Sequence, residues 1–474
     1  MNEDLFYKCS EINDYLIDGD EPKARDLLIQ LLDYVGRNNI QYFPLLNSLI
    51  REVGLYPYMD VNSSEWEDAF VYNLFKADIG LNEEKVLHRE QFRLLSSLLA
   101  GKNIAVSAPT SFGKSFVIDA FIKLRKPRNV AIIVPTIALT DETRRRIYKK
   151  FANEYNIITT TDIPLAERNI FIFPQERALC YVNKIDSLDI LIVDEFYKSS
   201  KDFEKERSAS LIKAIIKLGQ IAKQKYYLAP NITKIEDNQF TKDMEFMKMD
   251  FNTVFLKVTD YYPQIGTDTQ KKGEYFLNLN RTLKGKTLIY AGSFSNITSL
   301  SNLILETSPK IDSVLLNDFS DWLGKNYDYN WNLTLLAKRG VGVHNGSLHR
   351  SLSQIQIKLF EENEGLNRLI STSSIIEGVN TSAENVIVWM TSGRGLQFSN
   401  FAYKNLIGRA GRMFKHFIGN FRTLKILFYI FINGNAYIPE TFIPCKNNRT
   451  FFKSYFTVFV NCFERRFPEK RNHV

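Results

Sequence analysis

Short apolar segments alternate with longer amphipathic segments through most of this 474-residue chain. Such alternation is typical of βαβ units, because parallel strands need a crossover connection that is usually a helix. The first set of apolar segments is NIAVSA, NVAIIVP, DILIVDE and KYYLAP, and a second set follows with KTLIYAG, DSVLLN, VGVHN, RLISTS and NVIVWM. The pattern predicts two α/β domains in tandem, at residues 86–265 and 281–432, separated by a polar linker at 266–280.

The N-terminal part of the chain does not follow this alternation. Residues 1–85 show helical spacing of apolar residues, with Asp20 as a suitable N-cap and Pro22 in the first turn of one predicted helix. The segment predicts a helical accessory region. It either packs on the first α/β domain, which is the favoured interpretation, or binds a partner.

The C-terminal part also departs from the pattern, from about Phe421 onward. It is rich in Phe, Asn, Lys and Arg and has no clear period. The favoured interpretation is a frameshift near residues 419–421, with an atypical, disordered tail at 433–474. The alternative is a genuine basic and aromatic tail that binds nucleic acid by charge and stacking. The segment LKILFYIFI at 424–432 is a candidate for the last strand of the second domain.

Charge and composition add little about function. The net charge is +8, but residues 413–474 hold ten Lys or Arg and three Glu and therefore carry +7 of it. The rest of the chain is nearly neutral, so global charge is weak evidence for a nucleic-acid partner. No apolar run reaches the ~18–20 residues of a membrane helix. The four cysteines are far apart and form no CxxC pair. These features predict a cytoplasmic protein with no membrane partner.

The segment APTSFGKS, at residues 108–115, has the spacing of a phosphate-binding loop. It follows a predicted strand and precedes a predicted helix, which is the context that such a loop requires. Gly113 lets the backbone curl, Lys114 pairs with the β- and γ-phosphates, and Ser115 offers its hydroxyl to Mg²⁺. The expected nucleotide contacts are Ala108, Pro109, Thr110, Ser111, Phe112, Gly113, Lys114 and Ser115. The alternative is an ordinary glycine turn before a helix.

Two further motifs fit nucleotide hydrolysis. Asp194 and Glu195 end an apolar strand, so one carboxylate can hold Mg²⁺ and the other can polarise a water molecule. Arg409 and Arg412, in NLIGRAGR, are three residues apart and share one face of a helix. Presented by the second domain, they can stabilise charge on a γ-phosphate. The alternatives are a solvated acidic pair and a solvated basic helix.

These motifs, in this order, resemble the superfamily 2 helicases, and in particular the DExH branch that includes exosome-associated helicases. The resemblance implies two RecA-like domains, ATP with Mg²⁺ as cofactors, and a single-stranded or partly duplex DNA or RNA partner. It assigns adenine recognition to Gln91 and further ATP contacts to Gly378 and Asn380. It assigns nucleic-acid contacts to Pro135, Thr136, Glu176, Arg177 and Thr372. The wording of SAPTSFGKS and VDEFYK also resembles helicases of phage-defence loci, the Hachiman type in particular, here C-terminally truncated; a companion defence protein is the partner that this suggests.

Several positions depart from the family pattern. Tyr197 stands where His or Asp is usual, Asn231 falls in the LAPN segment that replaces S/T-A-T, Asn405 stands where Gln is usual, and Ser382 stands where Pro is usual. We expect a contact between Tyr197 and Asn231 to take over the coupling of the two domains. The sequence therefore predicts an ATP-dependent helicase or translocase. The alternative function is a non-cycling remnant that binds ATP and nucleic acid without unwinding.

The basic run ETRRRIYKK at 142–150 has two possible interpretations. It is either a solvated helix face, which is the favoured interpretation, or a contact to a phosphate backbone. His344 is interpreted as a structural residue, because no partner at metal-ligand spacing is visible in the sequence.

Overall fold

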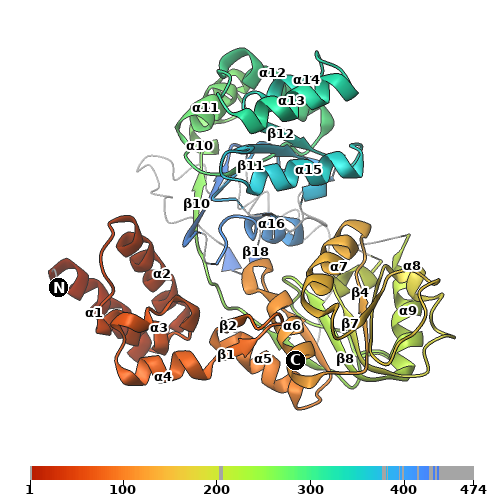
Figure 1. Ribbon diagram of the computed structural model, residues 1–474. Coiled ribbons are helices and arrows are strands. Elements are labelled where there is room, and N and C mark those ends of the chain that lie inside the picture. The colour runs from red at the N-terminus through yellow and green to blue at the C-terminus, as the bar shows by residue number, and fades with distance from the viewer. Residues whose placement is uncertain are drawn as a thin grey trace, which may run out of the picture. The chain divides into compact units, whose positions relative to one another are not determined.

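The computed structural model describes residues 3–201, 206–375, 381, 383–393, 396–397, 400–413, 416–425, 431–432 and 435–436. It contains two parallel sheets, each flanked by helices (Figure 1). This arrangement confirms the predicted α/β class with two RecA-like domains and an N-terminal helical region. Among the described helices, none combines the length and the apolar character needed to cross a lipid bilayer.

The first sheet has seven parallel strands in the order β5-β6-β4-β7-β8-β3-β9. Successive residues of its strands point to opposite faces, so that Ile132 packs in one apolar core and Ile133 in the other. The strands are β3 (Ile104–Ser107), β4 (Asn129–Ile133), β5 (Asn156–Ile158), β6 (Asn169–Phe173), β7 (Leu188–Val193), β8 (Ala222–Ala229) and β9 (Glu245–Lys248). The helices are α5 (Arg89–Leu99), η3 (Thr110–Phe112), α6 (Lys114–Arg125), α7 (Ile137–Phe151), α8 (Gln175–Ala178), η4 (Phe196–Ser199) and α9 (Ser208–Ile221).

The second sheet has six parallel strands in the order β10-β17-β14-β11-β13-β12. Its strands are β10 (Phe255–Asp260), β11 (Thr287–Tyr290), β12 (Val341–His344), β13 (Arg368–Ser371), β14 (Asn385–Val388) and β17 (Ile418–Thr423). Its helices are α10 (Tyr262–Ile265), α11 (Thr269–Thr282), α12 (Phe294–Thr307), α13 (Val314–Asn326), α14 (Asn332–Ala337), α15 (Arg350–Glu361), η5 (Ser373–Ile375) and α16 (Asn400–Ile407). A short hairpin of β15 (Ser392–Gly393) and β16 (Leu396–Gln397) follows β14.

Two sequence predictions for this half of the molecule are wrong. The polar segment expected as a linker at 266–280 lies largely in helix α11, whose Phe276 and Leu279 are buried under the second sheet. The apolar segment DSVLLN, expected as a strand, instead opens helix α13. The second sheet also begins earlier than predicted, since β10 (Phe255–Asp260) pairs with β17. The chain therefore crosses between the sheets at residues 249–254.

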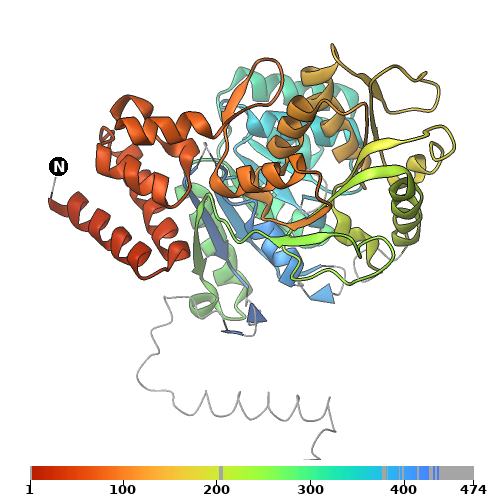
Figure 2. The same ribbon diagram turned by 90° about the horizontal axis from the view of Figure 1, so that it is seen from below.

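The N-terminal region consists of helices α1 (Glu3–Ile17), α2 (Glu21–Arg37), α3 (Pro44–Glu52) and α4 (Trp66–Leu74), which form one group in Figure 2. The 3-10 turns η1 (Tyr56–Tyr58) and η2 (Val61–Ser63) lie between α3 and α4, and a two-stranded ribbon of β1 (Lys76–Asp78) and β2 (Glu84–Val86) follows.

The apolar core of these helices reaches beyond the first α/β domain. It includes Phe251 and Met413, with Phe255 and Phe417 packed against it. The Tyr58 hydroxyl donates to the Thr253 carbonyl at 2.8 Å. We call this contact, made by Phe251, Phe255, Met413 and Phe417 with the N-terminal helices, the N-terminal junction. The prediction of packing on the first domain alone is thus incomplete, because the helices also hold the crossing segment and the edge of the second sheet.

Residues 428–474 form a separate unit, in which the hairpin of β18 (Phe431–Ile432) and β19 (Asn435–Ala436) is described. The middle of the predicted strand at 424–432, residues 426–430, lies outside the described residues, and so does the predicted tail at 433–474 apart from residues 435–436. Strand β17, which does complete the second sheet, precedes them at Ile418–Thr423 and buries Phe421.

Candidate nucleotide-binding site and nucleic-acid interface

The predicted phosphate loop connects β3 to α6. Strand β3 is fully buried, so its carboxyl end delivers Ala108 to the edge of the sheet, where α6 begins at Lys114. Gly113 has φ of +77°, a left-handed conformation that favours glycine. A Cβ atom at Gly113 would also lie 2.6 Å from the Gln91 Nε2 atom. The left-handed turn therefore favours glycine here, and the Gln91 side chain packs closely against it.

Lys114 is folded back onto its own loop. Its Nζ atom donates to the carbonyl oxygens of Ala108 at 3.0 Å and Pro109 at 3.4 Å. Removal from water lowers the pKa of the Lys114 ammonium, while the charges of Glu195 and Asp194 raise it. The ammonium thus lies where the loop curls and near both acidic residues. Binding of a phosphate requires it to exchange carbonyl partners for phosphate oxygens.

The acidic pair follows strand β7 at the same edge of the sheet. The Glu195 N–H donates to the Asp194 Oδ1 atom at 2.9 Å, and Glu195 has a φ of +52°, which is unusual for a residue other than glycine. Burial raises the pKa of both carboxyl groups, and the Asp194 charge raises that of Glu195 further. The positive charge of Lys114 acts against the shift in each case.

The residues expected to hold Mg²⁺ fit a nucleotide-bound ion better than an ion held by protein alone. Asp194 supplies one carboxylate and Ser115 one hydroxyl, at the start of α6. Within the described part of the chain, no group of three His, Cys, Asp or Glu could hold a metal. Mg²⁺ is usually bound by one or two carboxylates together with substrate phosphates.

The phosphate loop meets the arginine motif of the second domain directly. The Thr110 hydroxyl donates to the Gly408 carbonyl at 2.9 Å, and a Cβ atom at Gly408 would clash with the Thr110 hydroxyl oxygen. Nearby, the Asn231 side-chain amide donates to the Asn405 Oδ1 atom at 3.1 Å. Two hydrogen bonds therefore join the nucleotide edge of the first sheet to helix α16 and to Gly408, which follows it.

The two predicted arginine fingers differ in their surroundings. Burial lowers the pKa of Arg409, and the charges of Glu195, Glu142 and Tyr197 raise it. Arg409 thus lies within electrostatic reach of the acidic pair. The backbone of Arg412 forms a bridge with His416, and its charge acts on Arg409. The structure brings Lys114, Asp194, Glu195 and Arg409 together, with Arg412 beside them.

The expected contact between Tyr197 and Asn231 is wrong. Asn231 bonds to Asn405, whereas Tyr197 hydrogen-bonds to Glu195 and packs against Phe401, with ring centroids 4.4 Å apart. Each residue therefore couples the domains through a different partner on α16. The two atypical positions Asn231 and Asn405 compensate for each other across 174 residues of sequence, which inspection of either segment alone does not reveal.

Gln91 does not offer its amide to a base in this conformation. It is buried, its Oε1 atom accepts from the His88 N–H at 3.1 Å, and its Nε2 atom donates to the Phe112 carbonyl at 2.8 Å. The first bond belongs to a capping box with His88 at the start of α5. In this conformation Gln91 positions the phosphate loop; its role in adenine recognition stays a prediction and requires the amide to exchange these partners for the base.

A continuous series of ring contacts runs from this loop to the N-terminal helices. The His88 ring lies edge-on to Phe112 and stacks on Phe251 at 4.6 Å. The Arg25 guanidinium of α2 lies 4.2 Å from the centroid of the Phe251 ring. Burial lowers the pKa of His88 to about 3, so the imidazole is neutral at physiological pH. The N-terminal junction thus contacts the residue that caps α5 and holds the phosphate loop.

The predicted nucleic-acid contacts lie at the carboxyl ends of strands in both sheets. Thr136, after Pro135 and β4, caps α7 by accepting from the Leu139 N–H at 3.3 Å. Thr372 follows β13 and is buried, with its hydroxyl 3.5 Å from that of Ser374. Ligands of open α/β sheets bind at this edge, and the contact of Thr136 and Thr372 with nucleic acid stays a prediction.

The remaining residues singled out from the sequence differ in where they lie and in what they contact. Glu176 and Arg177 follow β6 and are exposed. The Glu176 carboxylate accepts two bonds from Arg207, at 2.7 and 2.9 Å, and Arg177 donates to the Thr159 carbonyl at 2.6 Å. Gly378, Asn380 and Ser382 lie outside the described residues. His344 is buried and 2.9 Å from the Ser374 hydroxyl, which is consistent with a structural role.

Comparison with protein families agrees with this geometry. The DEAD/DEAH box helicase family matches residues 88–228, and the N-terminal domain of anti-bacteriophage protein B matches residues 1–69. The chain therefore contains a DEAD/DEAH box helicase domain, which confirms the predicted resemblance to superfamily 2 helicases, and its first 69 residues are similar to a domain named for anti-bacteriophage activity. The finer resemblance to the Hachiman type stays a prediction.

The individual relatives include one anti-bacteriophage protein and two helicases. The chain is 30% identical to anti-bacteriophage protein B of Escherichia coli over 88% of this chain and 58% of that protein. It is 23% identical to the ATP-dependent DNA helicase Hel308 of Thermoplasma volcanium, over 75% of this chain and 54% of that protein. It is 26% identical to the human helicase POLQ-like, over 67% of this chain and 33% of that protein. The matched part of this chain thus spans about half the length of the first two relatives and a third of the length of the third.

Proposed function

We propose that this protein is an ATP-dependent nucleic-acid helicase or translocase that acts in phage defence. The observation that carries the proposal is the contact between the phosphate loop and the arginine motif, made by Thr110 and Gly408 at 2.9 Å. In a protein with two α/β domains, such a contact lets the state of one nucleotide control how the domains meet. The helicase domain at 88–228 and the homology to anti-bacteriophage protein B support the reaction and its setting.

ATP with Mg²⁺, when bound, supplies a γ-phosphate whose transfer to water releases free energy. In the proposal, Lys114 leaves the Ala108 and Pro109 carbonyls and holds phosphate oxygens. Asp194 and Ser115 would hold the metal, and Glu195 would orient the attacking water and accept its proton. A raised pKa suits Glu195 for this role, because it makes the carboxylate a better base. Arg409 and Arg412, which belong to the second domain, would stabilise the negative charge on the γ-phosphate.

The same contacts would couple hydrolysis to movement. Asn231 and Asn405 join the domains beside the nucleotide, while Thr136, Arg177 and Thr372 lie at strand ends that would grip the sugar–phosphate backbone. Backbone contacts of this kind hold a strand without reading its bases. Opening and closing of the domains would move the grip along the strand. DNA and RNA are both candidates, and a companion defence protein is a further proposed partner.

Steady-state ATPase assays with and without single-stranded DNA or RNA test this function. We expect nucleic acid to stimulate hydrolysis and Lys114→Ala to abolish it, because the charge that holds the phosphates is lost. Lys123→Ala is the matched control, since Lys123 lies on the same helix and pairs with Glu154 on the surface. Equal turnover in the wild type and Lys114→Ala would falsify the assignment.

A second variant separates binding from chemistry. Glu195→Gln retains the shape of the side chain but loses the base, so we expect ATP to bind with near wild-type affinity while hydrolysis falls at least a hundredfold, at the low end of what general bases contribute (~10²–10⁴). Binding of ATP and nucleic acid by the wild type without any hydrolysis would instead support the alternative of a non-cycling remnant.

A further inference from the structure

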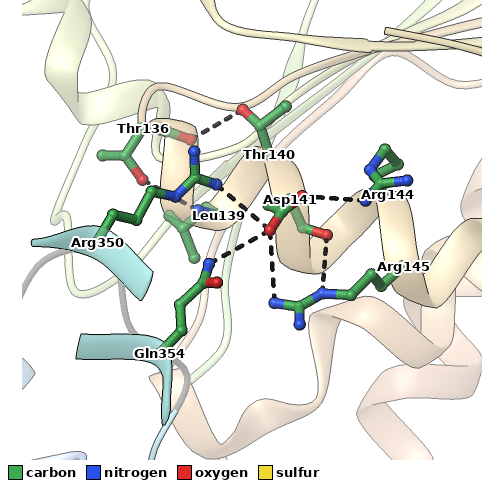
Figure 3. A network of polar contacts seen from close by, with 8 residues as sticks. All are labelled: Thr136, Leu139, Thr140, Asp141, Arg144, Arg145, Arg350 and Gln354. Atoms are coloured by element: carbon green, nitrogen blue, oxygen red, sulfur yellow. Dashed lines mark hydrogen bonds and ion pairs between the residues drawn. The ribbon is translucent and has the colours of Figure 1, made fainter. Parts of the chain in front are cut away.

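Three arginines from two domains converge on one aspartate at the junction of the sheets. Asp141, on α7, accepts from Arg144 at 3.2 Å and lies 3.7 Å from Arg145. From α15 of the second domain, Arg350 approaches the same carboxylate at 3.4 Å and Gln354 donates to it at 3.3 Å. Figure 3 shows Arg350 and Gln354 pointing toward Asp141 from α15. We call these five residues the Asp141 cluster.

The cluster carries more positive than negative charge. Three guanidinium groups share one carboxylate, and the side chains of Arg144, Arg145 and Arg350 are 44%, 46% and 44% exposed. Partial burial raises the pKa of Asp141, but bonds from Gln354 and Arg144 and the charges of Arg145 and Arg350 lower it more. Asp141 is therefore ionised at neutral pH. Exposed arginines in this number are a suitable surface for phosphate groups, which accept several charge-assisted bonds.

The place of the cluster in the fold is the second observation. Helix α7 begins one turn before Asp141, at the Thr136 cap that follows β4, and α15 begins at Arg350, soon after β12. Both helices thus start at the carboxyl edges of their sheets, where the proposed strand would lie. The cluster joins the two halves of that edge across 209 residues of sequence between Asp141 and Arg350.

The other basic residues of α7 do not take part. Arg146 and Lys150 face the interior, where both pair with the buried Asp119 of α6. Glu142 acts electrostatically on Arg409, on the nucleotide side. Of the five basic residues at 142–150, Arg146 and Lys150 thus form an inner structural pair, Arg144 and Arg145 form an outer pair at Asp141, and Lys149 is exposed outside both pairs. The outer pair fits both a solvated face and a contact to a phosphate backbone, and the proposal takes the second.

We propose that Arg144, Arg145 and Arg350 form a further binding surface for the phosphate backbone of a single strand, and that the Asp141 carboxylate occupies this surface when no strand is bound. The proposal rests on the proposed function. A backbone phosphate would take over bonds that Asp141 now accepts, so the strand would be held at once by a helix of each domain.

The test compares two variants that break the same ion pair. Arg350→Gln removes a phosphate ligand, so we expect the dissociation constant for a labelled single strand to rise about tenfold. The slope of log K against log salt should fall by about 0.7, the value for one phosphate contact on a single strand. Asp141→Asn removes the competing carboxylate, so we expect binding to tighten several-fold. Fluorescence anisotropy with oligo-dT and oligo-U, without ATP, gives both quantities.

Arg37→Gln is the matched control, because Arg37 is an exposed arginine in an ion pair with Asp33 on α2. A purely structural ion pair would make Arg350→Gln and Asp141→Asn change binding in the same direction, and that result would overturn the inference. An Arg350→Gln protein that binds the strand as tightly as Arg37→Gln would also overturn the inference. The proposed function would still stand if the wild type hydrolyses ATP and binds the strand. If the wild type binds no strand, the inference and the proposed function are both wrong.

Discussion

The N-terminal junction and the Asp141 cluster both join the domains, but they do so by different means. At the N-terminal junction Phe251 and Met413 are 3% and 7% exposed, and the apolar contacts exclude water. At the Asp141 cluster the contacts are ionic, and the three arginines remain almost half exposed. Fully burying a large apolar side chain contributes about 1.5–3 kcal/mol, whereas an exposed ion pair contributes about 0–1 kcal/mol.

This difference indicates which junction can open. A junction that costs little to break, and whose charges water or phosphates can satisfy, suits a contact that is made and lost during a reaction. An apolar junction exposes its side chains to water when it opens, so it suits a permanent contact. We therefore expect the domains to move about the N-terminal junction, with the Asp141 cluster opening and closing.

The largest effect is expected from Phe251→Ala at the N-terminal junction. The variant removes a buried ring that lies between Arg25 and His88, and such substitutions cost about 3–5 kcal/mol of unfolding free energy. Urea unfolding followed by circular dichroism measures the loss. Phe70→Ala is the control, because Phe70 is 59% exposed on α4. A Phe251→Ala protein as stable as Phe70→Ala would show that the junction does not hold the domains.

The second effect is a pH dependence that belongs to the same junction. Burial lowers the pKa of His88 from 6.5 to about 3, so the unfolded state binds a proton between these values and the folded state does not. Stability therefore falls as pH falls from 6.5 toward 3, by up to about 5 kcal/mol at about 1.4 kcal/mol per pH unit. His88→Asn retains an N-cap side chain but cannot titrate, and its unfolding free energy should vary less over this range. An unchanged pH slope would contradict the assignment to His88.

A smaller effect is expected where the domains meet beside the nucleotide. Asn405→Ala removes the acceptor of the bond from Asn231, a neutral bond worth about 1 kcal/mol. We expect stimulation of the ATPase by nucleic acid to fall several-fold while unstimulated hydrolysis changes little. Asn73→Ala, which removes an exposed amide on α4, is the control. Equal loss of stimulated and unstimulated activity would mean that Asn405 serves the active site rather than the coupling.

The smallest effect on stability is expected at the Asp141 cluster. A double-mutant cycle of Asp141→Asn and Arg350→Gln should give a coupling free energy of about 1 kcal/mol or less, because both partners are hydrated. Urea unfolding of the four proteins measures it. A coupling of several kcal/mol would mean that the Asp141 cluster is as strong as the N-terminal junction. It would then give no reason to expect the domains to move about the N-terminal junction.

Much of the candidate site could be predicted from local sequence. The alternation of apolar segments predicted both parallel sheets, and Lys114, Asp194 and Glu195 fall at the carboxyl ends of β3 and β7 as the spacing indicated. Such predictions succeed because a strand and the loop after it depend mainly on residues adjacent in the chain. Predictions made from polarity alone fail. Residues 266–280 were predicted as a linker because they are mostly polar, but most of them form helix α11, which buries Phe276. The many polar residues obscure the helical spacing of the apolar ones.

Contacts between distant residues could only be decided by the tertiary structure. Local sequence determined that Asn231 and Asn405 were both unusual, but not that they bond to each other. It predicted an adenine contact for Gln91, but not that the Gln91 amide bonds to His88 and Phe112. It placed Arg144 and Arg145 on a helix, but not opposite Arg350. The physical reason is that a side chain's partner depends on how separately formed elements pack, and that packing brings together residues that no local pattern relates.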